Sequence, residues 1–282
     1  MQRALNQRIS TSGPAAHYWP LKEPMIQSLM IAKTKQKSRL EFFMLRVLLS
    51  AAIFGVLVAV TCQLWYPGGH LQIHGADRRL LILAGVVFVI GAVLSTAFYR
   101  PGKPRLLADL GILFGVEMLA LAIGANKIYA ERPAAVVFAI DRFEVMSAQD
   151  LDRNLLRYDE LYAYNGSEPL LVIARLPADP VERSNLAMSV VLEGAADIDR
   201  RPDLWHPFES GQEEVVASSR SVALLEAADT DGLLAQWLAS SGQPENEVAF
   251  LPIRGSVRDA VLLISRADAR PLGIVDVDPW LE

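Results

Sequence analysis

Three long apolar runs occupy the first half of this chain, and they limit its possible folds more than any other feature. They extend over residues 47–66, 80–99 and 106–125, and the first two contain no charged side chain. Because an α-helix rises 1.5 Å per residue, about 20 apolar residues cross the hydrocarbon core of a bilayer. The sequence therefore predicts a membrane protein with three transmembrane helices within residues 39–130.

The second half has a different composition and predicts a separate domain. Residues 1–130 contain 14 Lys and Arg and 5 Asp and Glu, whereas residues 131–282 contain 13 Arg, no Lys and 27 Asp and Glu. About 150 residues are enough for one compact domain with its own core. Nucleic-acid binding requires clustered basic side chains, so no nucleic-acid partner is expected for this acidic domain.

The distribution of basic residues predicts the orientation in the membrane. Lys and Arg cluster just before the first run and again at Arg100, Lys103 and Arg105, whereas Arg78 and Arg79 are the basic residues between the first two runs. Since cytoplasmic segments carry the excess of Lys and Arg, we expect a cytoplasmic N-terminus and an exported C-terminal domain. The expected location is the inner membrane of a bacterium. The domain would then be periplasmic, and residues 1–38 would form a disordered cytoplasmic tail.

The third run carries two acids and a pair of glycines, which makes it the candidate contact helix. Asp109 lies near its cytoplasmic end and Glu117 near its middle, where a carboxylate must be neutral or paired. Glu117 could bond to a polar group of the bundle such as Gln63 or Thr96, or it could contact a partner's transmembrane helix. Gly111 and Gly115 form a G-x-x-x-G pattern that allows close helix packing, either within the bundle or with a partner.

The pattern after residue 131 predicts an α+β domain with an antiparallel sheet. Apolar runs at 134–140 and 170–175 are typical of buried strands, and three β-branched runs near the C-terminus are typical of a hairpin meander. Capping residues predict helices from 147–150 to 158 and from Pro180 to 192. Further helices are expected at 219–227 and 231–239, with a loop over 201–212.

No catalytic or metal-binding constellation is evident in the sequence. Cys62 is the single cysteine, so no intramolecular disulfide can form. His70 and His74 are four residues apart in a short loop without a third ligand beside them. We therefore expect neither enzyme activity nor a cofactor.

Six segments together resemble one family, the TfpX/TfpZ-type accessory proteins of type IV pilins. The most specific is the segment Arg132–Glu144, and the similarity extends from Arg39 to Glu282. The others are Trp65–Gly68, Tyr99–Lys103 with the following Asp109 and Glu117, Asp197–Pro202, Leu251–Gly255 and Asp278–Trp280. The chain departs from the family pattern in the second run, where Val87 and Ala92 replace an acid and a proline, and at Glu117, which replaces a glutamine.

The resemblance implies an inner-membrane accessory protein whose partner is the major pilin, with other pilus assembly proteins as further possible partners. In this hypothesis Gly111, Gly115 and Glu117 contact the pilin helix, and Asp109 pairs with its N-terminal amine. The segment containing Asp141 and Arg142 is either a membrane-proximal strand with local charge pairs or an edge strand that binds pilin. The alternative function is a membrane-anchored ligand-sensing or solute-binding domain.

Overall fold

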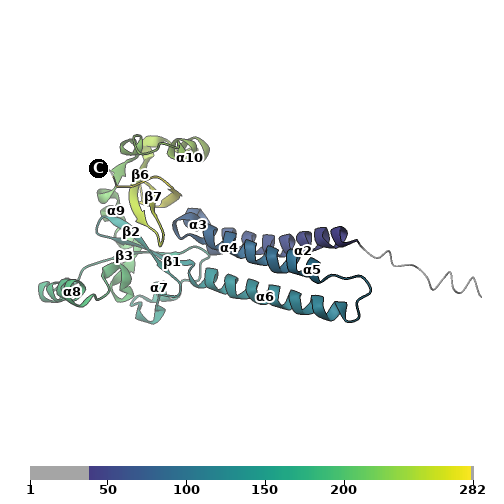
Figure 1. The fold of residues 1–282 in the computed structure, drawn as a ribbon. Coiled ribbons are helices and arrows are strands. Elements are labelled where there is room, and N and C mark those ends of the chain that lie inside the picture. Colours follow the sequence, from purple (N-terminus) through teal and green to yellow (C-terminus); the bar gives the residue numbers. More distant parts are fainter. Residues whose placement is uncertain (1–37, 281–282) are drawn as a thin grey trace, which may run out of the picture. The chain divides into compact units, whose positions relative to one another are not determined.

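The computed structural model describes residues 38–280 (Figure 1). The predicted tail at 1–38 therefore lies almost entirely outside the described residues. Three helices in this part of the chain are long and apolar enough to cross a membrane: Arg39–Trp65, Ala76–Phe98 and Leu106–Ala130. The first two begin several residues before the predicted runs.

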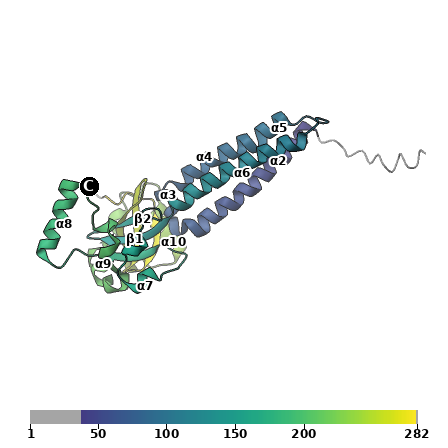
Figure 2. The same ribbon diagram turned by 90° about the horizontal axis from the view of Figure 1, so that it is seen from below.

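The first two of these helices each contain a π-helical segment. The first consists of α2 (Arg39–Val60) and the π-segment η1 (Thr61–Trp65). The second consists of α4 (Ala76–Phe88), the π-segment η3 (Val89–Leu94) and α5 (Ser95–Phe98), whereas the third is the single helix α6 (Leu106–Ala130). The helices run side by side in both views (Figure 2). The second helix is more buried than the other two, because it packs against both of them.

The loop between the first two spans connects the helices to the domain. It contains the 3₁₀ turn η2 (Pro67–Gly69) and the short helix α3 (His70–Ile73). The Tyr66 hydroxyl donates to the carbonyl oxygen of Ile128 at 2.8 Å, which joins the loop to the end of α6. On the other side, the amide of Val257 donates to the carbonyl oxygen of Ile73 at 3.0 Å.

The domain contains one mixed sheet of eight strands. The strands are β1 (Pro133–Ala139), β2 (Arg142–Ser147), β3 (Leu170–Ala174), β4 (Trp205–Pro207), β5 (Arg220–Ser221), β6 (Val248–Arg254), β7 (Asp259–Ser265) and β8 (Pro271–Val275). Their order is β4-β3-β1-β2-β6-β7-β8, and β5 also pairs with β6.

The prediction of an antiparallel sheet is wrong, because two of the strand pairs are parallel. These pairs are β1 with β3 and β2 with β6. Strand β2 returns the chain to the edge of the sheet where β1 began, and the 22 residues from 148 to 169 then lead past β1 to the start of β3, which therefore runs parallel to β1. The β6–β7–β8 meander is antiparallel as predicted.

The prediction of a helix from residues 147–150 to 158 is also wrong. Ser147 ends strand β2, which follows β1 through a tight turn at Ile140 and Asp141. Ile140 has a φ of 63°, a conformation for which Gly or Asn is the usual signal. The segment up to residue 162 then contains the 3₁₀ turn η4 (Arg153–Leu155) and the short helix α7 (Asp159–Tyr162).

Short helices cover both faces of the sheet. One face packs Phe138, Phe143 and Leu251 against Ile73 of α3 and against helix α9 (Gln212–Ser218). The opposite face is divided between a cluster beneath α7 and α8 (Pro180–Glu193) and a second cluster beneath α10 (Leu233–Ser241). The sheet interior therefore contacts α3, which belongs to the loop between the first two spans.

The close contact at Gly255 gives a test of this junction. A Cβ added there would lie 2.7 Å from the carbonyl oxygen of Arg258 and would also meet the carbonyl oxygen of Ile73. Because both neighbours are backbone atoms, we expect Gly255→Ala to lower the free energy of unfolding by about 2 kcal/mol. Thermal unfolding in detergent would measure this change, with Gly85→Ala as the control, since Gly85 has no described neighbour within 4 Å. Equal melting temperatures for the two variants would contradict the tight junction.

Candidate functional site

Four polar groups from three helices meet inside the apolar bundle. The guanidinium of Arg46 in α2 forms a salt bridge with Glu117 in α6, and its Nε donates to the carbonyl oxygen of Gly91 at 2.9 Å. The Ser50 hydroxyl donates to the second carboxylate oxygen of Glu117 at 2.6 Å. Only 1% of Glu117 and 8% of Arg46 is exposed, so we call these residues the buried polar cluster.

Gly91 gives this cluster its space. A side chain at position 91 would collide with the Ser50 hydroxyl and the Glu117 carboxylate. Gly91 also lies in the π-segment η3 of the second helix, and π-segments are often found where a helix serves a function. The cluster therefore links all three helices at one level and fixes how each is rotated.

Arg46 is the partner of Glu117 that the sequence did not reveal. Glu117 bonds to Arg46 and Ser50, and not to the suggested candidates Gln63 or Thr96. Arg46 lies one residue before the first apolar run, so the charge pattern places it among the basic residues on the cytoplasmic side of that run. An intramembrane acid is a reason to search the helix ends for a basic partner, because an unpaired charge at that depth is costly.

The three glycines of α6 lie in different environments. Gly124 packs against Leu83, where an added Cβ would meet a side-chain carbon at 2.7 Å. Gly111 and Gly115 have no described neighbour within 4 Å of the added Cβ. The G-x-x-x-G pattern of Gly111 and Gly115 is therefore not used for packing within the described bundle.

The surface around Gly111 and Gly115 is apolar and unpartnered in the described chain. We call it the outer face of α6. Its large exposed side chains are Leu107, Ile112, Val116, Leu119 and Ile123. Glu117 points away from this face, so the structure does not bring the predicted contact residues Gly111, Gly115 and Glu117 to one surface.

Asp109 lies at the end of α6 that the basic residues predict to be cytoplasmic. It forms a salt bridge with Lys103 in the preceding link, and both side chains are about one-third exposed, at 32% and 39%. Such partly exposed pairs contribute little stability, about 0–1 kcal/mol. The Asp109 carboxylate could therefore exchange partners at low cost.

Asp141 and Arg142 lie at the turn between β1 and β2, away from the helices. Arg142 bonds to Asp141 at 3.1 Å and to Glu144 at 2.8 Å. Strand β1 lies between β3 and β2, so the interpretation of this segment as an edge strand is wrong. Strand β1 begins three residues after the end of α6, and the charges of Asp141 and Arg142 pair locally.

Two buried histidines lie in the loop between the first two spans. Burial, with the nearby His74 as a smaller cause, lowers the pKa of His70 to about 3. Burial, reinforced by Arg79, lowers the pKa of His74 to about 4. His74 Nδ1 is 2.9 Å from the Ser256 hydroxyl, so this pair joins the loop to the turn after β6. Across residues 38–280, no three His, Cys, Asp or Glu side chains are grouped to hold a metal ion.

Comparison with known proteins connects this arrangement to fimbriae. The chain is 26% identical over 180 residues to the serogroup I fimbrial assembly protein of Dichelobacter nodosus, covering 62% of this chain and 69% of that protein. It is also 26% identical over 188 residues to the serogroup E1 protein of the same organism, with 64% and 70% covered. The serogroup C1 and C2 protein matches over 106 residues, 37% of this chain and 81% of that protein, again at 26% identity.

The other comparisons add no relationship. No protein-family model matches the chain, and no solved structure matches it. The similarities therefore support a relationship with fimbrial biogenesis proteins as a group, in agreement with the resemblance found in the sequence. They do not distinguish one member of that group.

Breaking the buried polar cluster should be far more harmful than removing it. Glu117→Leu leaves the Arg46 charge buried without a partner, so we expect a loss of about 3–5 kcal/mol in stability. The double variant Arg46→Met with Glu117→Leu removes both charges and should recover most of that loss. Unfolding of the purified protein by SDS in mixed micelles would measure both. Equal destabilisation by the single and the double variant would contradict the pairing.

The lowered pKa values of His70 and His74 predict that the folded chain is less stable at acidic pH. Their folded pKa values lie below the unfolded value of about 6.5, so between about pH 6.5 and pH 4 the unfolded chain binds more protons. Stability should therefore fall with falling pH by up to about 1.4 kcal/mol per pH unit for each histidine. Unfolding curves measured from about pH 7.5, about one unit above this window, down to about pH 4.5 would show how the free energy of unfolding changes with pH. An unchanged slope in the double variant His70→Gln with His74→Gln would contradict this origin.

Proposed function

We propose that this chain is an inner-membrane accessory protein of type IV pili, of the TfpX/TfpZ type, that binds the major pilin and modulates its stability, its assembly or the dynamics of the pilus. The similarity to fimbrial assembly proteins carries this proposal. No enzymatic step is part of it. The N-terminus and the link Arg100–Arg105 lie in the cytoplasm, and the mixed-sheet domain lies in the periplasm.

The outer face of α6 supports the proposed contact with a pilin helix. A membrane helix gains little from burying apolar side chains that lipid already covers, so close backbone approach at small residues drives association. Gly111 and Gly115 offer such an approach, and no described part of the chain occupies it. Glu117 acts here as a positioning residue, because its bond to Arg46 keeps this face turned outward.

Asp109 supplies a charged contact at the cytoplasmic end of α6. It lies two residues before Gly111 and points to nearly the opposite side of the helix, so its partner must reach it around the helix end, and its present partner Lys103 is partly exposed. A cationic amine at the end of the pilin helix would replace Lys103 as its partner. The exchange conserves one ion pair, so it costs little.

The exported domain provides a second contact on the same partner. A pilin held in the membrane by its helix keeps its head close to the domain, so the second contact is effectively intramolecular. Two weak contacts joined in this way bind more tightly than either alone. This arrangement suits a protein that holds pilin and then releases it.

A ligand-sensing or solute-binding function is the alternative, and one observation favours it. A cavity of about 510 Å³ opens between the sheet and the loop after the first span. Cavities of this size commonly accept small molecules. A rise in melting temperature with a small solute, in the absence of pilin, would support this alternative.

Co-purification with the major pilin tests the proposed function. The tagged chain should recover pilin from detergent extracts of a piliated strain, and Gly111→Leu with Gly115→Leu should reduce recovery by about tenfold, equivalent to about 1.4 kcal/mol. Gly85→Leu is the matched control, because it adds the same side chain at another open glycine of the bundle. Absence of pilin from the wild-type preparation would refute the proposal. Equal recovery with all variants would move the contact away from α6.

The charged part of the contact has its own test. Asp109→Asn removes the charge while keeping the size of the side chain, so we expect pilin recovery to fall by a few-fold, as for loss of a partly exposed ion pair. Lys103→Gln should leave recovery unchanged or raise it, because it frees the Asp109 carboxylate. Unchanged recovery with Asp109→Asn would exclude the proposed pairing.

A further inference from the structure

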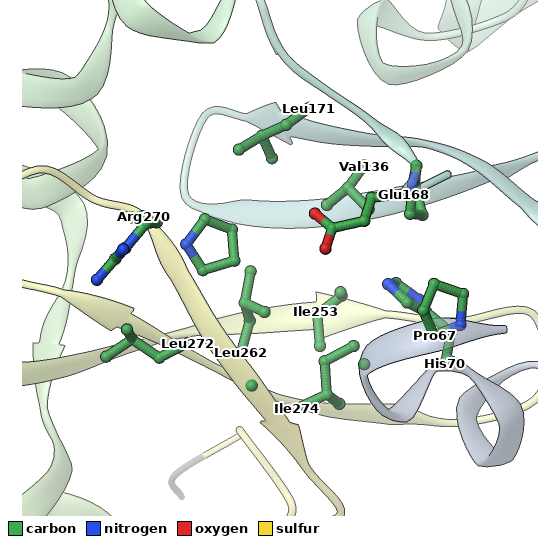
Figure 3. A pocket seen from close by; sticks show the side chains of 14 residues that line it. Pro67, His70, Val136, Glu168, Leu171, Ile253, Leu262, Arg270, Leu272 and Ile274 are labelled. Carbon is green, nitrogen blue, oxygen red and sulfur yellow. The ribbon is translucent and has the colours of Figure 1, made fainter. Parts of the chain in front are cut away.

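The cavity beside the sheet is an apolar groove on the membrane side of the domain. Figure 3 shows its lining, which comes from the turn after the first span and from one face of strands β1, β3, β6, β7 and β8. The cavity measures about 510 Å³. Its aliphatic walls are Val136, Leu171, Ile253, Leu262 and Ile274. Val136, Ile253 and Leu262 are buried members of the main core, and the partly buried Leu171 and Ile274 supply the apolar surface that the cavity exposes.

One wall of the groove is an edge strand. Strand β8 ends the sheet and pairs only with β7 among the described strands. Arg270 and the first four residues of β8 line the cavity. An unpaired strand edge beside an apolar cavity can accept the backbone of an extended segment, with alternate side chains entering the cavity.

Opposite charges mark the two ends of the groove. The Glu168 carboxylate lies at the end near Pro67 and His70, and the Arg270 guanidinium lies at the other end (Figure 3). Within residues 38–280 neither side chain takes part in a salt bridge. An extended segment with a basic residue at its membrane end and an acidic residue at its other end would form an ion pair with each of these side chains.

A buried polar atom also lacks a partner at this site. The His70 ring lines the groove with only 7% of the residue exposed, and its Nδ1 has no hydrogen-bond partner in the described chain. A buried, unsatisfied nitrogen costs about 1–3 kcal/mol. Since that nitrogen is closed off from solvent, a bound segment can bond to it only if the Pro67–His70 turn shifts.

The first 37 residues of the chain are not suited to occupy the groove. They join α2 at Arg39, whereas the groove adjoins Pro67, beyond the other end of the same membrane-spanning helix. To reach the groove this segment, which contains Lys33, Lys35 and Lys37, would have to cross the bilayer.

We infer that the groove between strand β8 and the Pro67–His70 turn binds an extended apolar segment of the exported part of the pilus subunit. The segment pairs with the edge of β8 and places alternate aliphatic side chains against Leu171 and Ile274. A basic residue near the membrane meets Glu168, and an acidic residue at the other end meets Arg270. This inference rests on the proposed function, because it locates the contact of the exported domain with pilin.

Site-specific photocrosslinking in a piliated strain tests the groove. A photoreactive benzoyl-phenylalanine replaces Glu168 or Arg270 in the full-length chain, since both side chains are exposed at the rim. The matched control carries the same residue at Val191, which is 79% exposed on α8 outside the groove. We expect a crosslinked product with pilin from positions 168 and 270 and none from 191.

A cavity-filling variant provides a second, independent measurement. Leu171→Trp occupies the groove, so recovery of pilin should fall by about tenfold, equivalent to about 1.4 kcal/mol. Val181→Trp, on the exposed part of α8, should leave recovery unchanged. Thermal unfolding of both variants shows whether the fold is retained. The crosslinking experiment uses a chain with an unfilled cavity, so its result is independent of any misfolding of Leu171→Trp.

The possible outcomes separate this inference from the proposed function. Pilin recovered with the wild type but not crosslinked at 168 or 270 would overturn the groove assignment and keep the function. A crosslinked product of twice the chain's mass would assign the groove to a second copy, which also overturns the inference. Failure of the wild type to recover any pilin would overturn both proposals together.

Discussion

A single ion pair inside an apolar helix bundle determines how this molecule presents its surfaces. Arg46 and Glu117 are costly to bury separately, and they are stable together because Ser50 and the Gly91 carbonyl complete their hydrogen bonds. The three helices must therefore keep a fixed rotation about their axes and a fixed height relative to one another. The outer face of α6, with Gly111 and Gly115, is outward because Glu117 is inward.

The second constraint lies where the helices meet the domain. Tyr66, Ile73 and His74 connect the first loop to the end of α6 and to the turn after β6. Gly255 permits this contact because no side chain fits between the two backbone segments. The same loop forms the floor of the groove beside β8, so the proposed contacts in the membrane and in the domain belong to one connected unit.

Much of this fold follows from local pattern, and the remainder depends on long-range pairing. The apolar runs, the strands at 134–140 and 170–175 and the C-terminal meander were predictable because their periodicity and breakers are clear. Strand β2 was not, because its preceding turn places Ile140 in a conformation that sequence rarely signals. The parallel pairing of β1 with β3 could not be read from either strand alone.

The candidate site shows the same division. Gly111, Gly115, Asp109 and Glu117 were identified from residue type and spacing, and the structure places all of them on α6. Which of them face outward could not be predicted, since it depends on Arg46, 71 residues earlier in the chain. The groove beside β8 was also beyond the sequence, because its walls come from five strands and a loop that only the folded sheet brings together.

A photocrosslinking scan along α6 in living cells is the most direct test of the central claim, that the buried pair turns the glycine-containing face toward pilin. A photoreactive residue is placed in turn at each position from 110 to 121 except 117, where it would break the ion pair with Arg46. The account predicts crosslinks to pilin with a helical period, strongest near Gly111 and Gly115 and absent at Leu113 and Leu121. Crosslinks that peak at the inward positions, or no pilin crosslink at any position in a piliated strain, would contradict it.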